Sequence, residues 1–111
     1  MNNNVLLVGR LVHAPESKHS SDGEQIASIT VAVTCGIKNK KGEYETDFFD
    51  CISKGKMATN ILKMCKKADI VGVKGHLKTK IVEKDYGSRE SLIVIVADSV
   101  SVIKSAEEKD V

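Results

Sequence analysis

This chain has few aromatic residues and no long apolar run. Its 111 residues include no tryptophan, two tyrosines, two phenylalanines and one proline. The longest apolar run, Leu92–Ala97, has six residues, whereas a membrane-spanning helix needs about 20. The opening residues, Met1–Asn4, lack the basic start of an export signal. These absences predict a cytoplasmic protein without a membrane segment, and the length predicts a single domain.

Residue patterns typical of metal sites or catalysis are also lacking. The three cysteines, Cys35, Cys51 and Cys65, form no close C-x-x-C pair. The three histidines are dispersed, and no phosphate-binding glycine loop, nucleophile elbow or H-E-x-x-H motif occurs. We therefore expect three buried thiols in a reducing compartment, no metal or other cofactor, and no enzymatic activity.

The charges are unevenly distributed along the chain. The formal net charge is only +2, but residues 36–80 carry eleven lysines against five acids, a local charge of +6. The remaining residues carry six bases and ten acids, a charge of −4. A basic segment of this kind indicates a polyanionic partner.

Apolar periodicity predicts five strands and one helix. The first strand, residues 4–12, has apolar residues on both faces, so we expect both faces to be covered. A lysine-rich hairpin loop is expected over residues 36–43, a turn over 85–88, and glycine-marked bends in the strand that contains Gly72 and Gly75. The expected strands are residues 4–12, 25–34, 47–53, 70–81 and 91–103, and the expected helix is 56–67.

This order of elements is that of the OB-fold, a five-stranded Greek-key barrel that is all-β apart from one helix. We assign the barrel to residues 1–104 and a short polar tail to residues 105–111. The fold alone does not separate nucleic-acid binding from other kinds of binding, because one fold hosts many functions.

Six sequence stretches, in order along almost the whole chain, make it similar to bacterial single-stranded DNA-binding proteins. The resemblance implies a homo-oligomer, usually a tetramer, that wraps single-stranded DNA without sequence preference. Such proteins combine lysine-lined grooves for phosphates with aromatic rings on which bases stack. The stretches are Asn4–Leu11 followed by Pro15–Glu16, Ala27–Val33, Asp47–Cys51, Gly55–Asn60, Val71–Thr79 and Ala97–Val100.

The positions at which the family usually places aromatic rings correspond here to Ile37, Phe48, Lys54 and Val82, and only Phe48 keeps a ring. Each missing platform costs about 1–3 kcal/mol per base. Lysines offset part of this loss, so we expect binding that depends more on charge than on stacking, with Tyr86 compensating for Val82. Expected at subunit interfaces are Asn4, Val5, Leu6 and Phe49. The expected DNA-binding residues are Arg10, Ile37, Lys38, Lys40, Lys41, Phe48, Lys54, Lys56, Lys67, Lys74, Lys78, Lys80, Val82, Tyr86 and Arg89.

The last residues, 107–111, include three acids but no terminal aromatic. Housekeeping members of the family recruit replication proteins through a longer acidic tail with such a terminus, so recruitment of that kind is not expected, and a phage-type or paralogous form fits better. Two alternatives stay open. One is a dimeric adaptor similar to primosomal replication protein N, and the other is an OB-fold protein-interaction module with little DNA binding.

Overall fold

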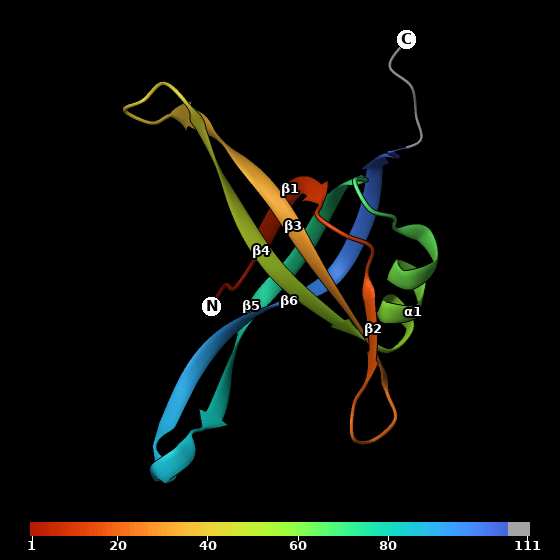
Figure 1. The fold of residues 1–111 in the computed structure, drawn as a ribbon. Helices are drawn as coiled ribbons and strands as arrows, with labels where there is room; N and C mark the ends of the chain where they lie inside the picture. The colour runs from red at the N-terminus through yellow and green to blue at the C-terminus, as the bar shows by residue number, and fades with distance from the viewer. Residues whose placement is uncertain (107–111) are drawn as a thin grey trace.

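A computed structural model describes residues 1–106 as strands with a single α-helix (Figure 1). The order of elements agrees with the prediction except for one additional short strand. The elements are β1 (Val5–Leu11), β2 (Glu16–His19), β3 (Gln25–Lys38), β4 (Tyr44–Lys54), α1 (Gly55–Met64), β5 (Ile70–Glu83), the 3-10 turn η1 (Asp85–Gly87) and β6 (Arg89–Lys104).

Five of the strands close into a barrel in the order β1-β5-β6-β4-β3. Closure comes from a short antiparallel pairing of β1 with β3, in which Arg10 lies opposite Ala32 and Leu11 opposite Val31. β4 and β6 run parallel, and the other neighbours run antiparallel. β2 lies outside the barrel and pairs with the first residues of β3. This topology is that of the OB-fold, which confirms the predicted fold class.

Two glycines permit close approaches of the backbone in the barrel wall. A Cβ atom on Gly9 would lie 2.2 Å from the carbonyl oxygen of Ala32 on β3. A Cβ atom on Gly75 would lie 2.0 Å from the carbonyl oxygen of Val96 on β6. The β5–β6 register shifts between Lys74 and Gly75, as expected for a glycine-marked bend. Glycine is therefore required at both positions, because any side chain would collide with the neighbouring strand.

The core fills the barrel, and one end is covered by α1. Side chains from all five barrel strands are buried, among them Leu11, Ile29 and Val73. The helix contributes Ala58 and Ile61 from its apolar face, followed by Cys65 at the C-cap. The helix has ten residues and ends at Met64, three residues before the predicted end. Within residues 1–106, no helix is both long and apolar enough to cross a membrane.

Three predictions about local structure were wrong. The polar stretch after β1 contains β2, because its backbone pairs with the start of β3 although all four side chains are exposed. β3 continues to Lys38, so the hairpin loop is limited to residues 39–43. Cys35 is only partly buried, whereas Cys51 and Cys65 are buried as predicted.

The prediction that both faces of the first strand are covered is also wrong for the single chain. Leu6, Val8 and Val12 are 66%, 52% and 39% exposed. Their side chains alternate with those of Leu7 and Leu11, which pack in or against the core. Both faces of β1 are apolar, but a single chain buries only the face that carries Leu7 and Leu11.

Two long hairpins project from the barrel on the side away from α1 (Figure 1). The β3–β4 hairpin ends at residues 39–43, and the β5–β6 hairpin ends at η1. The short loops let each strand pair continue well beyond the barrel wall. These hairpins carry most of the candidate binding residues.

Candidate nucleic-acid interface

The outer face of β4 is formed by its even-numbered residues, which are exposed except for the half-buried Ile52. Strand alternation places Phe48, Asp50, Ile52 and Lys54 on this face, and Phe49 and Cys51 on the inner one. Phe48 is 64% exposed. Phe49, expected between subunits, is half-buried and lies on the inward face of its own chain.

At the end of this face a groove of about 680 Å³ opens between β4 and the β5–β6 hairpin. Three of the expected DNA-binding lysines, Lys54, Lys78 and Lys80, line it together. Lys54 reaches it from β4, whereas the other two lie on β5, which passes on the far side of β6. The tertiary structure thus gathers three cations that the sequence separates.

The floor of the groove is apolar. Ile52 lies opposite Val96 in the parallel pairing of β4 with β6, and Val94 lies opposite Lys78 in the β5–β6 ladder. All three of these aliphatic side chains line the groove. A groove with a basic rim and an apolar floor can hold phosphates at its edge and the flat faces of bases inside.

Two acidic groups, Asp98 in the groove lining and Asp22 near Lys54, are hydrogen-bonded to neighbours. His76 Nδ1 lies 2.8 Å from a carboxylate oxygen of Asp98, and both residues line the groove. Asp22, near Lys54, accepts hydrogen bonds from the Ser20 hydroxyl and from the Glu24 N–H. These bonds, with the charge of Lys54 as a smaller cause, hold the pKa of Asp22 below its ordinary value. The negative charge of Asp22 offsets part of the Lys54 charge.

The β3–β4 hairpin has a well-defined turn at its tip, with Lys40 and Lys41 in the loop and Lys38 at the end of β3. The side-chain oxygen of Asn39 accepts hydrogen bonds from the backbone N–H groups of Lys41 and Glu43, at 2.9 and 3.0 Å. Gly42 completes the turn with a φ of +78°, a conformation that favours glycine. The expected binding residues on this hairpin tip are Ile37, Lys38, Lys40 and Lys41, all exposed.

The tip of the β5–β6 hairpin holds Val82, Tyr86 and Arg89. Tyr86 is fully exposed, with a φ of +78°, and Val82 is half-buried. The charges here are paired: Lys84 Nζ lies 2.7 Å from Glu90, and Arg89 Nε lies 3.9 Å from Glu83. This tip is consequently less basic than the β3–β4 tip.

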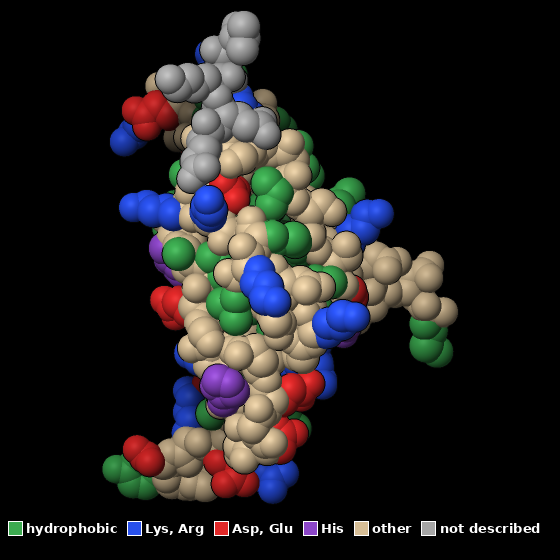
Figure 2. All heavy atoms as spheres, turned by 90° about the vertical axis from the view of Figure 1, so that its right-hand side faces the viewer, with side chains coloured by type: hydrophobic (Ala, Val, Ile, Leu, Met, Phe, Trp, Pro, Cys, Tyr) green, Lys and Arg blue, Asp and Glu red, His purple; other side chains and the backbone are tan. Residues whose placement is uncertain are grey.

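Four other expected DNA-binding residues lie away from the groove. Arg10 donates a hydrogen bond from Nη1 to the carbonyl oxygen of Ala68 at 2.9 Å, so it tethers the loop after α1 to β1. Lys56 and Lys67 lie at the two ends of the helical region. Figure 2 shows the helix side, where lysine and arginine side chains stand apart from one another. Lys74, on β5, lies beside β1.

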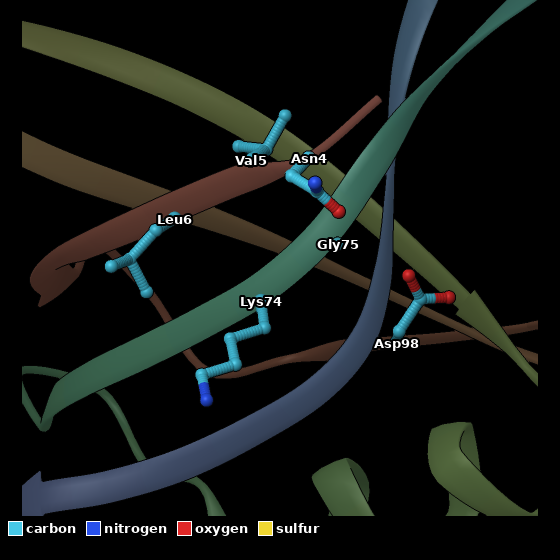
Figure 3. Close-up of a pocket in the computed structure, with 6 residues that line it drawn as sticks. All are labelled: Asn4, Val5, Leu6, Lys74, Gly75 and Asp98. Carbon is cyan, nitrogen blue, oxygen red and sulfur yellow. The ribbon is translucent and has the colours of Figure 1, made fainter. Parts of the chain in front are cut away.

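Three of the four residues expected at a subunit interface line a smaller hollow of about 340 Å³ (Figure 3), and Phe49 does not. Asn4, Val5 and Leu6 reach it from the β1 side, Lys74 from β5 and Asp98 from β6. Residues 5–9 of β1 pair with β5 on one side, and the β1–β3 pairing involves only residues 10 and 11. The opposite edge of residues 5–8 is therefore open for pairing, whereas Gly9 lies against the backbone of Ala32.

Comparison with known proteins agrees with this geometry. The model of the Single-strand binding protein family matches residues 2–103. The chain belongs to this family. It is 34% identical over 105 residues to single-stranded DNA-binding protein 1 of Lactococcus lactis, covering 95% of this chain and 70% of that protein. It is 37% identical over 100 residues to single-stranded DNA-binding protein B of Bacillus subtilis, covering 90% and 88%.

A solved structure also shares the fold. A deletion mutant of the single-stranded DNA-binding protein from Thermus aquaticus superposes with a TM-score of 0.77 at 20% identity. The similarity covers 95% of this chain and 52% of the Thermus chain. At this identity it supports the OB-fold assignment.

The apolar floor of the groove was not predicted from the sequence. Ile52, Val94 and Val96 were read as strand residues without a binding role. A binding role for Ile52 could have been predicted, because alternation places it on the same face of its strand as Phe48 and Lys54. The positions of Val94 and Val96 in the groove depend on the β5–β6 register, which the sequence does not reveal.

Proposed function

We propose that this protein binds single-stranded DNA without sequence preference and protects it during replication, recombination or repair, as a non-enzymatic cytoplasmic protein. The observation that carries the proposal is the outer face that runs from Phe48 through Ile52 into the groove lined by Lys54, Lys78 and Lys80. Membership of the Single-strand binding protein family supports it, and so do relatives whose names describe single-stranded DNA-binding proteins.

Binding is dominated by charge. The groove and the β3–β4 tip together present six lysines, whereas the outer face of β4 presents two rings, those of Phe48 and Tyr44. Each neutralised phosphate of a single strand contributes about 0.7 to the slope of log affinity against log salt concentration. Six such contacts give a slope of about −4.

The protein acts as a homo-oligomer. An open edge along residues 5–8 of β1 and the exposed side chains of Leu6 and Val8 offer backbone hydrogen bonds and apolar area to a second copy. A tetramer is the form we propose. Light scattering measures the mass directly, and a stable dimer would favour an adaptor similar to primosomal replication protein N.

The decisive experiment is fluorescence anisotropy of labelled oligo-dT, titrated with the protein at several salt concentrations and with duplex of equal length as competitor. The expected result is tight binding that duplex does not displace and that weakens steeply with salt. Tight binding with a shallow slope would contradict the charge-dominated mechanism. Weak binding that duplex or heparin displaces equally well would overturn single-strand specificity and favour the protein-interaction module.

A further inference from the structure

We infer that Tyr44, at the base of the β3–β4 hairpin tip, stacks on a base of the bound single strand. This inference rests on the proposed function and extends its binding surface beyond the groove to the projecting hairpin. Four observations carry it: the exposure of the ring, its position relative to Phe48, the placement of acids on the strand, and its contact with Lys38.

Tyr44 and Phe48 lie on the same face of β4. They are four residues apart, and side chains two and four residues apart share a face of a strand. They are 56% and 64% exposed. Their separation along the strand is about 13 Å at about 3.3 Å per residue. The two rings can therefore stack on two different bases of one DNA strand, and the small side chain of Thr46 lies between the rings.

The acidic residues of this part of β4 lie on the opposite face. Glu45 and Asp47 occupy the odd-numbered positions, and Tyr44 and Thr46 the even ones; Glu43 precedes the strand. Alternation thus keeps the face with the rings free of carboxylates from the tip to Phe48. A polyanion can therefore lie along this face between the tip and Phe48 without meeting a carboxylate of β4. The next residue of the face is the exposed Asp50, whose carboxylate accepts a hydrogen bond from the Thr30 hydroxyl at 2.6 Å.

Lys38 supplies the matching cation. It lies opposite Tyr44 in the β3–β4 ladder, and its Nζ is 5.5 Å from the centre of the Tyr44 ring. This distance is within the range of a cation–π contact. A nucleotide stacked on the other side of the ring would bring its phosphates near this ammonium group. The hydrogen bonds of Asn39 hold the turn that joins β3 and β4. Because this turn is already ordered, DNA binding loses less conformational entropy there.

Intrinsic fluorescence provides a direct test, because the protein has two tyrosines and no tryptophan. In the Tyr86→Phe variant, Tyr44 is the one tyrosine that remains. We expect unlabelled oligo-dT to quench its emission at least twofold at saturation, with the same midpoint as the anisotropy titration. Unchanged emission, under conditions where anisotropy shows saturated binding, would overturn the inference.

Affinity measurements provide a second test. Tyr44→Ala should weaken oligo-dT binding about 5- to 150-fold, and Tyr44→Phe should bind as the unaltered protein does because it keeps the ring. Thr46→Ala, on the same face without a ring, is the matched control and should change affinity less than twofold. Tyr44→Ala should leave the salt slope unchanged, whereas Lys38→Gln should reduce it by about 0.7.

These outcomes separate the two proposals. If Tyr44→Ala binds as tightly as the unaltered protein, the stacking role is wrong and the proposed function stands. If the unaltered protein does not bind oligo-dT in the anisotropy assay, the proposed function fails and the stacking role fails with it. Equal thermal midpoints for the Tyr44 and Thr46 variants would exclude unfolding as the cause of any loss.

Discussion

The side chain of Asn3 pairs with the backbone of Leu77 in the way that a strand residue would. Its Nδ2 donates to the Leu77 carbonyl oxygen at 2.7 Å, and its Oδ1 accepts from the Leu77 N–H at 2.9 Å. The regular β1–β5 register begins at Val5 opposite Gly75. The amide of Asn3 therefore extends the ladder to the point where the β5–β6 hairpin leaves the barrel, and it helps to set the position of the lysines farther along β5.

Replacing Asn3 with alanine should loosen this junction. A hydrogen bond contributes about 0.5–1.5 kcal/mol, so we expect the exchange protection of the Leu77 amide to fall by about tenfold. The global free energy of unfolding should change little, because the site is exposed. Amide hydrogen exchange checks this, with Asn2→Ala as the control on an exposed neighbour. Unaltered protection at Leu77 in Asn3→Ala would show that the pairing does not hold the hairpin.

Gly9→Ala should destabilise the barrel strongly. The added Cβ would lie 2.2 Å from the Ala32 carbonyl oxygen, so β1 or β3 would have to move at the point where the barrel closes. We expect a loss of about 2–3 kcal/mol in the free energy of unfolding, measured by urea denaturation. Gly36→Ala is the control, since a Cβ there meets nothing within 4 Å, and it should cost less than about 0.5 kcal/mol.

The three thiols should react at different rates. Burial, with a smaller contribution from the charge of Asp50, raises the pKa of Cys51 to about 11, and burial also raises the pKa of Cys65. Since the thiolate is the reactive form, we expect one fast thiol per chain at pH 8, that of the partly exposed Cys35. Titration with a chromogenic disulfide checks this count. Cys35→Ser should abolish the fast reaction, and denaturant should expose all remaining thiols.

Lysines in the groove should contribute more to DNA affinity than lysines of the helical region. Replacing both Lys78 and Lys80 with glutamine should reduce the salt slope of oligo-dT binding by about 1.4. The same change at Lys56 and Lys67, which do not line the groove, removes equal charge and should reduce the slope less. Equal reductions would indicate attraction by the total charge and no specific path along the groove.

Local patterns were enough to predict the elements of this fold. Alternation, helical spacing and turn residues located five strands and the helix, and their order indicated the OB-fold. These signals are local because side-chain direction follows the backbone period. β2 escaped prediction because its four exposed side chains carry no apolar pattern, and only the backbone of β3 makes it a strand.

The sequence yielded candidate site residues one by one but not their arrangement in space. By itself the sequence determined the strands and helix, the excess of lysine between residues 36 and 80, and the stretches that resemble the family. The tertiary structure decided that Lys54 meets Lys78 and Lys80, that Arg10 binds the Ala68 carbonyl, and that one face of β1 is exposed. The physical reason is that strand register and barrel closure depend on contacts between residues far apart in the chain, which no local pattern encodes.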